Sequence, residues 1–173
     1  NLNQTNLQNL LNEWNLNYKD KKSDEEYWQN LFRSYSWVIS QIFACPYTLI
    51  GSKCYYGGKR VNNKGGVVGD FLYKSALTNN VGFIEIKTPS IDLMGRQYRG
   101  ENPDDENTVF SVSEELSGAV NQLMNQRITF IQKKDSLGYT SNVHNAKAIL
   151  IAGSLKETNE SKYKSLELYR NSL

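Results

Sequence analysis

The feature that most constrains the fold is a pair of apolar segments separated by a short polar turn. Val67–Tyr73 and Val81–Thr88 are both rich in Val, Ile and Phe, which favour extended backbone. Thr78–Asn80 between them has residues that are typical of turns, and Pro89 ends the second segment. The pattern therefore predicts a β-hairpin, in which the position of the turn is left open.

Charged residues lie at defined places on this hairpin. Side chains alternate across a strand, so Glu85 and Lys87 share one face, while Ile84 and Ile86 share the other. Folding the second strand back on the first brings Asp70 near Glu85, although the register between the strands is open. The sequence thus predicts a cluster of two carboxylates and one ammonium group on a sheet.

Such a cluster has a use in phosphodiester hydrolysis. Two carboxylates can hold a hard divalent cation such as Mg²⁺ through oxygen, and water and phosphate then complete its coordination. The cation acidifies a water molecule and neutralises charge on the phosphodiester, while a nearby lysine orients the water or stabilises the transition state. The same Glu-x-Lys spacing also occurs in amphipathic strands whose charged face is only solvated, and this alternative stays open.

The composition limits the class of protein. A chain of 173 residues is long enough for one domain with a hydrophobic core. The formal net charge is only +2, so binding of nucleic acid has to come from local basic residues. No apolar run reaches membrane-spanning length and no secretory signal pattern is present, so no membrane partner is expected. Cys45 and Cys54 lack metal-binding spacing and are interpreted as free thiols, which favours a cytoplasmic location.

Two helices are predicted before the hairpin. Leu2–Leu16 has leucines among many Asn and Gln residues and indicates a modest amphipathic helix. Ser23 with Glu26 fits a capping box that opens a second helix, with apolar residues at positions 27, 28, 31, 32 and 35. At about 100° per residue, Glu25 lies beside that apolar face and can reach an interior site, whereas Glu26 points away. The preference of acidic residues for helix N-termini explains Glu25 equally well.

Segments with basic residues precede and follow the hairpin. Residues 57–66 form a glycine-rich polar segment between Asp70 and a strand that is predicted over Tyr47–Tyr56 with a break at Gly51. After Pro89, residues 90–105 are predicted to form a long loop. The basic side chains that could contact a phosphate backbone are Lys59, Arg60 and Lys64, and the loop after Pro89 carries Arg96, Tyr98 and Arg99. Solvated loops without a ligand are the alternative interpretation.

A long helix is predicted in the second half of the chain. Ser111 and Glu114 fit a capping box, and the helix is expected over Ser113–Lys133. Glycine costs about 1 kcal/mol relative to alanine in a helix, so Gly118 suggests a close approach to the sheet. Gln122 lies on the same polar strip and points either at the Asp70–Glu85 face or into water.

The last elements are predicted to be a strand and a helix. Residues 146–153 (AKAILIAG) form an uninterrupted apolar run, which is typical of a buried strand inside a sheet. Residues 161–173 are expected to be helical. His144 is the single histidine of the chain and is interpreted as a surface residue.

This order of elements resembles the core of the PD-(D/E)xK nucleases, the restriction-endonuclease-like fold. That resemblance implies an α/β domain with a central mixed β-sheet flanked by helices. Several motifs are similar, more specifically, to the nuclease domain of the Shedu family. They are Glu25-x-x-Trp28-Gln29, Glu85-Ile86-Lys87-Thr88-Pro89, Tyr98-Arg99 and Ser113-Glu114-Glu115-Leu116-x-x-Ala119-x-x-Gln122, and the resemblance covers most of residues 23–170.

The resemblance to the Shedu family implies a metal-dependent endonuclease that cuts DNA, expected to be double-stranded, in bacterial anti-phage defence. It implies Mg²⁺ or Mn²⁺ as the cofactor, with Asp70 and Glu85 as metal ligands. Lys87 would assist the attacking water, and Glu25 and Gln122 would complete the catalytic site.

Arg99 would lie near the DNA by the same resemblance. The chain departs from the family pattern at Gly69, where the name of the superfamily has Pro, and it ends one helix after the AKAILIAG run. Its first residue is Asn, so we interpret it as an excerpt of a longer protein, with an N-terminal helix and linker (residues 1–22) and a nuclease domain (residues 23–173). Because Shedu proteins carry additional domains, a homo-oligomer through regions outside this chain is also expected.

Two other classes of function stay open. One is a catalytically inactive domain of the nuclease fold that binds nucleic acid, and the intact set of Asp70, Glu85 and Lys87 argues against it. The other is a regulatory domain whose charged sheet face meets a protein partner. Such a domain would show no salt-dependent binding to DNA.

Overall fold

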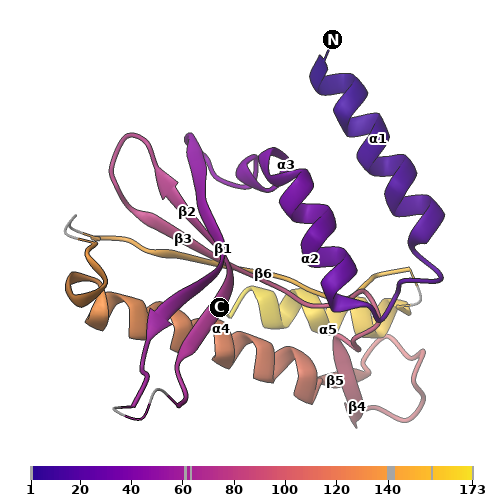
Figure 1. Ribbon diagram of the computed structural model, residues 1–173. Helices are drawn as coiled ribbons and strands as arrows, with labels where there is room; N and C mark the ends of the chain where they lie inside the picture. The colour runs from indigo at the N-terminus through magenta and orange to yellow at the C-terminus, as the bar shows by residue number, and fades with distance from the viewer. Residues whose placement is uncertain (1, 61, 63, 140–142, 157, 173) are drawn as a thin grey trace.

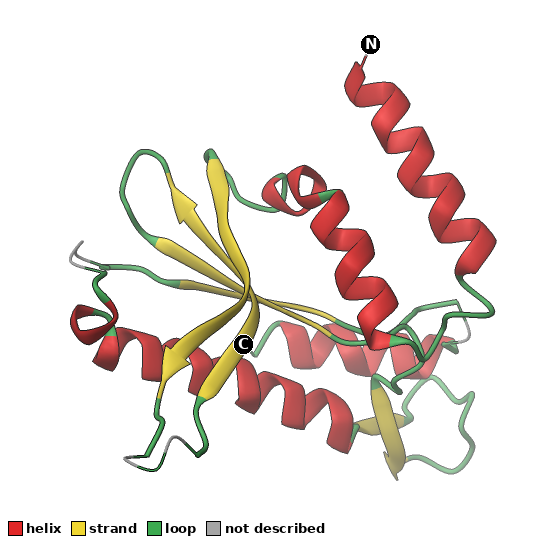
Figure 2. Ribbon diagram, in the orientation of Figure 1, coloured by secondary structure: helices red, strands yellow, loops and turns green. Residues whose placement is uncertain are grey.

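The computed structural model describes residues 2–60, 62, 64–139, 143–156 and 158–172 (Figure 1). Four strands form a mixed sheet in the order β1-β2-β3-β6, and two more form a separate sheet, β4-β5. Helices lie on both sides of the main sheet, so the expected α/β architecture is confirmed (Figure 2). The elements are α1 (Leu2–Asn17), α2 (Glu25–Ser34), α3 (Ser36–Ser40), β1 (Tyr47–Gly57), β2 (Val67–Ser75), β3 (Val81–Ile86), β4 (Met94–Arg99), β5 (Val109–Val112), α4 (Glu114–Lys133), the 3₁₀ turn η1 (Asp135–Leu137), β6 (Lys147–Ile151) and α5 (Glu160–Arg170).

Strands β2 and β3 form the predicted hairpin. They pair in antiparallel orientation, with Phe71 opposite Ile84. β3 ends at Ile86, two residues earlier than predicted, and its other edge pairs in parallel with β6. The backbone N–H of Lys87 still donates to the carbonyl oxygen of Ile151 at 2.8 Å. This bond holds Lys87 against the end of the sheet.

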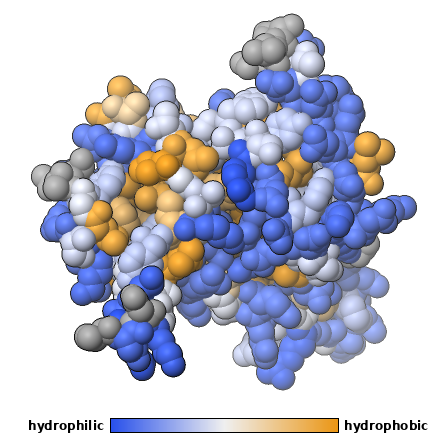
Figure 3. All heavy atoms as spheres, in the orientation of Figure 1, coloured by the Kyte–Doolittle hydropathy of each residue, from blue (hydrophilic) through white to orange (hydrophobic). Residues whose placement is uncertain are grey.

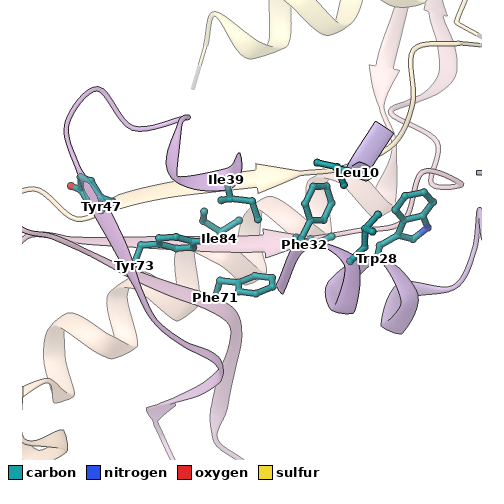
Figure 4. Close-up of a cluster of buried hydrophobic side chains, with 10 residues drawn as sticks. Leu10, Trp28, Phe32, Ile39, Tyr47, Phe71, Tyr73 and Ile84 are labelled. Carbon is teal, nitrogen blue, oxygen red and sulfur yellow. The ribbon is translucent and has the colours of Figure 1, made fainter. Parts of the chain in front are cut away.

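The two faces of the hairpin supply two separate cores. Phe71 and Ile84 belong to a core between the sheet and helices α2 and α3, and Figure 4 shows its aromatic and aliphatic side chains. Leu72 and Phe83 belong to a second core, in which Phe130 of α4 packs against them. Each large side chain that is buried in this way stabilises the fold by about 1.5–3 kcal/mol. Because both faces are covered, both strands of the hairpin have nearly continuous apolar sequences.

Strand β1 is one irregular strand rather than two segments separated at Gly51. It pairs with β2 along its length, and a register shift between Leu49 and Gly51 marks a bulge. Lys53 follows with a φ of +52°, in the left-handed region that residues other than glycine rarely adopt. The predicted break is therefore a local distortion within a continuous strand.

Three predictions for the second half of the chain were wrong. Residues 90–105 contain strand β4, which pairs with β5, so this segment is not a loop throughout. β6 is an edge strand, and four of its five residues are only half-buried, so the apolar run does not lie inside the sheet. Gly118 is exposed, and within the described residues no atom would lie within 4 Å of a Cβ there. It therefore makes no close approach to the sheet.

The N-caps of two helices lie one or two residues after the positions predicted from the sequence. The N-cap of α2 is Asp24 rather than Ser23, and the N-cap of α4 is Ser113 rather than Ser111. In each helix the side-chain oxygen accepts a backbone N–H three residues further on, at 3.0 Å. Glu26 consequently lies in the first turn of α2 but is not part of a capping box.

The surface of the molecule is mostly hydrophilic in the orientation of Figure 1. Apolar atoms gather over the sheet, whereas the two hairpins that project downward, β1–β2 and β4–β5, are mainly hydrophilic (Figure 3). Among the described residues, no helix is long and apolar enough to cross a lipid bilayer.

Gly69, which directly precedes Asp70, is required by the packing of Tyr56. A Cβ at Gly69 would lie only 2.2 Å from Cε2 of the Tyr56 ring, and this ring is buried against Phe83 and Phe130. We expect Gly69→Ala to lower the free energy of unfolding by about 1–3 kcal/mol, as overpacking of a core does. Gly118→Ala is the matched control, and we expect it to raise stability by up to about 1 kcal/mol. Urea unfolding of both variants measures these effects, and an equal response at the two positions would contradict the packing explanation.

Candidate active site

Asp70 lies where the β2–β3 pairing ends, and its side chain instead of its backbone accepts the next hydrogen bond from β3. The last paired residues are Phe71 and Ile84, so Asp70 and Glu85 come next on the two strands. Oδ2 of Asp70 accepts the backbone N–H of Ile86 at 2.8 Å. Asp70 as a residue is 5% exposed, so the negative charge of its carboxylate is costly unless donors surround it.

Two further side chains supply donors to Asp70. Nε2 of Gln29 donates to Oδ1 at 2.7 Å, and Nζ of Lys53 donates to the same oxygen at 2.9 Å. Gln29 also donates to Oε1 of Glu25 at 3.0 Å. The amide of Gln29 therefore connects Glu25, on the first turn of α2, to the carboxylate on β2.

Glu85 is held by an equivalent set of donors from the other face of the sheet. It is 2% exposed. Its Oε1 accepts from Gln122 at 2.6 Å and from Lys87 at 3.0 Å, while its Oε2 accepts from Gln126 at 2.7 Å. Gln122 and Gln126 are four residues apart on α4, so both amides project from one face of the helix. Together they fix both oxygens of the carboxylate.

The amide orientation of Gln126 follows from its surroundings. Nε2 donates to Glu85 and also to the carbonyl oxygen of Val68 at 3.2 Å. Rotating the amide by half a turn would place Oε1 against two acceptors, which is unfavourable. As oriented, Oε1 is buried without a hydrogen-bond partner among the described residues. Such a group is rare in folded proteins and is retained here beside Glu85.

Lys87 is a cation held among three carboxylates. Burial by itself would lower the pKa of Lys87, but the hydrogen bond to Glu85 and the negative charges of Glu85, Glu25 and Asp70 outweigh burial and raise it. The ammonium group is therefore protonated at neutral pH and acts as a donor of hydrogen bonds and positive charge. It cannot serve as a general base in this state.

The structure thus brings five of the predicted site residues together: Glu25, Asp70, Glu85, Lys87 and Gln122. Sequence reasoning assigned no role to Gln29, Gln126 or Lys53. Gln29 stood inside a quoted motif, and Gln126 is one helical turn after Gln122, so spacing could have found both. Lys53 could not be found in this way, because β1 has a bulge and Lys53 itself has a left-handed φ, so alternation does not predict where its side chain points.

The donor set is suited to a hard divalent cation held by few protein ligands. Among the described residues, no group of three or more His, Cys, Asp or Glu side chains could hold a metal ion. A carboxylate offers about four lone-pair positions. Asp70 and Glu85 each receive three hydrogen bonds, which leaves about one position on each. Mg²⁺ binds well to one or two carboxylates while it keeps several waters, so the residues present fit such an ion.

The predicted DNA contacts fall into two groups. Lys59, Arg60 and Lys64 are exposed on the hairpin that joins β1 to β2. Gly66 and Val67 at the base of this hairpin line one open pocket together with Gln122 and Gln126, which hold Glu85. Arg99 is exposed at the end of β4, in the separate two-stranded sheet, and its role in DNA binding stays a prediction.

Comparison of the sequence with known proteins shows which family the chain belongs to. The family model described as the C-terminal part of Shedu protein SduA matches residues 22–173. The chain belongs to the Shedu family. It is also 32% identical, over 179 aligned residues, to Shedu protein SduA of Bacillus cereus (strain B4264). That alignment covers 97% of this chain but 45% of the relative, so the chain spans less than half of the length of the relative it matches.

The Shedu match includes every residue that meets at the carboxylate cluster, from Glu25 to Gln126. The motifs quoted from the sequence therefore identified the family correctly. The family match assigns no chemical role to an individual side chain, so these roles rest on the geometry of the site.

Proposed function

We propose that this Shedu domain hydrolyses phosphodiester bonds of double-stranded DNA with the help of Mg²⁺ or Mn²⁺, as part of bacterial anti-phage defence. One observation carries the proposal. Two buried carboxylates, Asp70 and Glu85, lie at adjacent positions on neighbouring strands, and a protonated lysine lies beside them. The defence role rests on the family alone.

Asp70 and Glu85 would hold the divalent ion, which when bound supplies an acidified water and neutralises charge on the phosphodiester. The protein side chains position the reacting groups. The ammonium of Lys87 can donate to the attacking water or to an oxygen of the phosphate as negative charge develops there. Gln122 and Gln126 keep the Glu85 carboxylate in one orientation, because they bind its two oxygens from one rigid helix.

In this proposal the DNA approaches from the side of the β1–β2 hairpin, where basic residues are exposed. Lys59, Arg60 and Lys64 project from a hydrophilic hairpin next to the pocket that Gln122 and Gln126 line. Contacts of this kind bind the DNA backbone regardless of sequence and weaken as salt increases. Self-association through regions outside this chain stays a further expectation.

Plasmid cleavage by the full-length protein tests the proposal, because regions outside this chain can control activity. Supercoiled DNA should be nicked or linearised with Mg²⁺ or Mn²⁺ and left intact with EDTA. Cleavage that continues undiminished in EDTA would rule out the metal-dependent reaction. Salt-dependent binding of DNA without cleavage under either cation would instead favour an inactive domain of the nuclease fold.

A further inference from the structure

The position of Lys53 adds a residue to this site that neither the sequence motifs nor the proposed reaction uses. Its Nζ lies 2.9 Å from Oδ1 of Asp70. The side chain of Asp70 is 6% exposed, whereas that of Lys53 is 55% exposed. The ammonium group therefore reaches from solvent onto a carboxylate that is almost fully buried.

The backbone of β1 is distorted where this contact forms. On either side of Lys53, Ser52 pairs with Phe71 and Cys54 pairs with Gly69, so Lys53 lies across from Asp70. Its φ of +52° is unusual for lysine and occurs inside a strand. Backbone strain of this kind persists where the surrounding structure imposes it, and it is common at functional sites.

The charges at the site show what Lys53 compensates. Glu25, Asp70 and Glu85 supply three negative charges, and Lys87 supplies one positive charge that is bonded to Glu85. Lys53 supplies a second positive charge, bonded to Asp70. Each proposed metal ligand thus already carries an ammonium group.

The two ammonium groups differ in how easily they can leave. The side chain of Lys87 is 21% exposed, and three carboxylates act on it. Lys53 is half-exposed, and its ammonium pairs with the Asp70 carboxylate at the boundary with solvent. Because Asp70 is buried, loss of the ammonium alone would leave its charge uncompensated, so another cation rather than water has to replace Lys53.

We propose that Lys53 occupies the cation position on Asp70 in the metal-free protein and leaves it when a divalent cation binds. The inference rests on the proposed function, since it assumes that Asp70 is a metal ligand. The ion and the ammonium would share one carboxylate and repel each other, so binding of one opposes binding of the other. Lys53 would thereby offset part of the negative charge of the metal-free site and raise the cation concentration at which the site fills.

Calorimetric titration with Mn²⁺ tests the competition. We expect Lys53→Gln to bind Mn²⁺ about tenfold more tightly than the unaltered protein, because one repelling charge is gone. Lys53→Arg keeps the charge and should restore an affinity close to that of the unaltered protein. Lys74→Gln is the control for net charge, because Lys74 lies four residues from Asp70 on β2, about 13 Å away in an extended strand, and should leave the affinity unchanged.

The possible results separate this inference from the proposed function. Binding by the unaltered protein and equal or weaker binding by Lys53→Gln would overturn the role of Lys53 and leave the metal site intact. Absence of Mn²⁺ binding in both proteins would overturn both ideas together.

A second experiment measures directly whether the amine of Lys53 becomes accessible when the cation binds. Acylation of Lys53 by an amine-reactive ester, measured by mass spectrometry, should increase when Mn²⁺ is added, while acylation of Lys74 stays constant. Unchanged reactivity of Lys53 under conditions where Mn²⁺ binds would overturn the proposed displacement.

Discussion

Asp70→Asn is expected to abolish Mn²⁺ binding and to lower the rate of DNA cleavage by at least about a thousandfold. Asparagine has the same shape, so its amide oxygen can still accept the backbone N–H of Ile86. Its NH₂ group would then occupy the side where Gln29 and Lys53 now donate. A donor in that place offers a cation no ligand, and the negative charge is lost.

Lys87→Met is the companion variant that separates metal binding from catalysis. Methionine keeps most of the length of the side chain but removes the ammonium, while Gln122 and Gln126 still hold Glu85. We expect Mn²⁺ binding to persist and cleavage to fall by about 10²–10⁴-fold, the usual loss of a positioned donor or acid. Calorimetry with Mn²⁺ and plasmid nicking rates measure the two properties. If Lys87→Met loses Mn²⁺ binding as completely as Asp70→Asn, the assigned roles are wrong.

Glu25→Gln and Glu26→Gln form a matched pair, because both remove one charge from the first turn of α2. Glu25 accepts from Gln29, which in turn holds Asp70. We expect Glu25→Gln to slow cleavage by about 10–100-fold, as is usual when a residue that orients a metal ligand is altered. Glu26 is exposed, and its replacement should cost at most about 1 kcal/mol of stability through the helix dipole.

Nicking rates and melting temperatures of the two variants decide the matter. A Glu25→Gln protein with normal activity would remove this residue from the site. Reduced cleavage by Glu26→Gln at an unchanged melting temperature would indicate that the wrong glutamate has been assigned.

The centre of the fold was predictable because simple alternation governs it. Two apolar runs with a polar turn between them can pair in few ways, and pairing of Phe71 with Ile84 places Asp70 beside Glu85. Helical periodicity likewise placed Glu25 on the side of α2 that faces the site. These rules rely on regular backbone, and β2, β3 and α2 are regular.

The rest depended on irregular or long-range structure. Lys53 lies across from Asp70 in a strand that a bulge and the left-handed φ of Lys53 itself make irregular, and no periodic pattern encodes that. β4 has few apolar residues, and its partner β5 begins ten residues after it ends, so neither segment is strongly marked alone. The apolar run of β6 is compatible with either an interior or an edge strand, since partial cover on both faces gives the same composition.

The distances along the chain between the interacting residues have a consequence for biosynthesis. The hydrogen bonds from Gln29 to Asp70 and from Gln126 to Glu85 each span 41 residues, and the bond that holds Lys87 requires Ile151 of β6. On the ribosome, β2 with Asp70 and β3 with Glu85 emerge well before α4 and β6 are synthesised. Contacts of such long range form late. A growing chain thus has no organised site until nearly the whole domain has been translated, so any nuclease activity begins only with the finished fold.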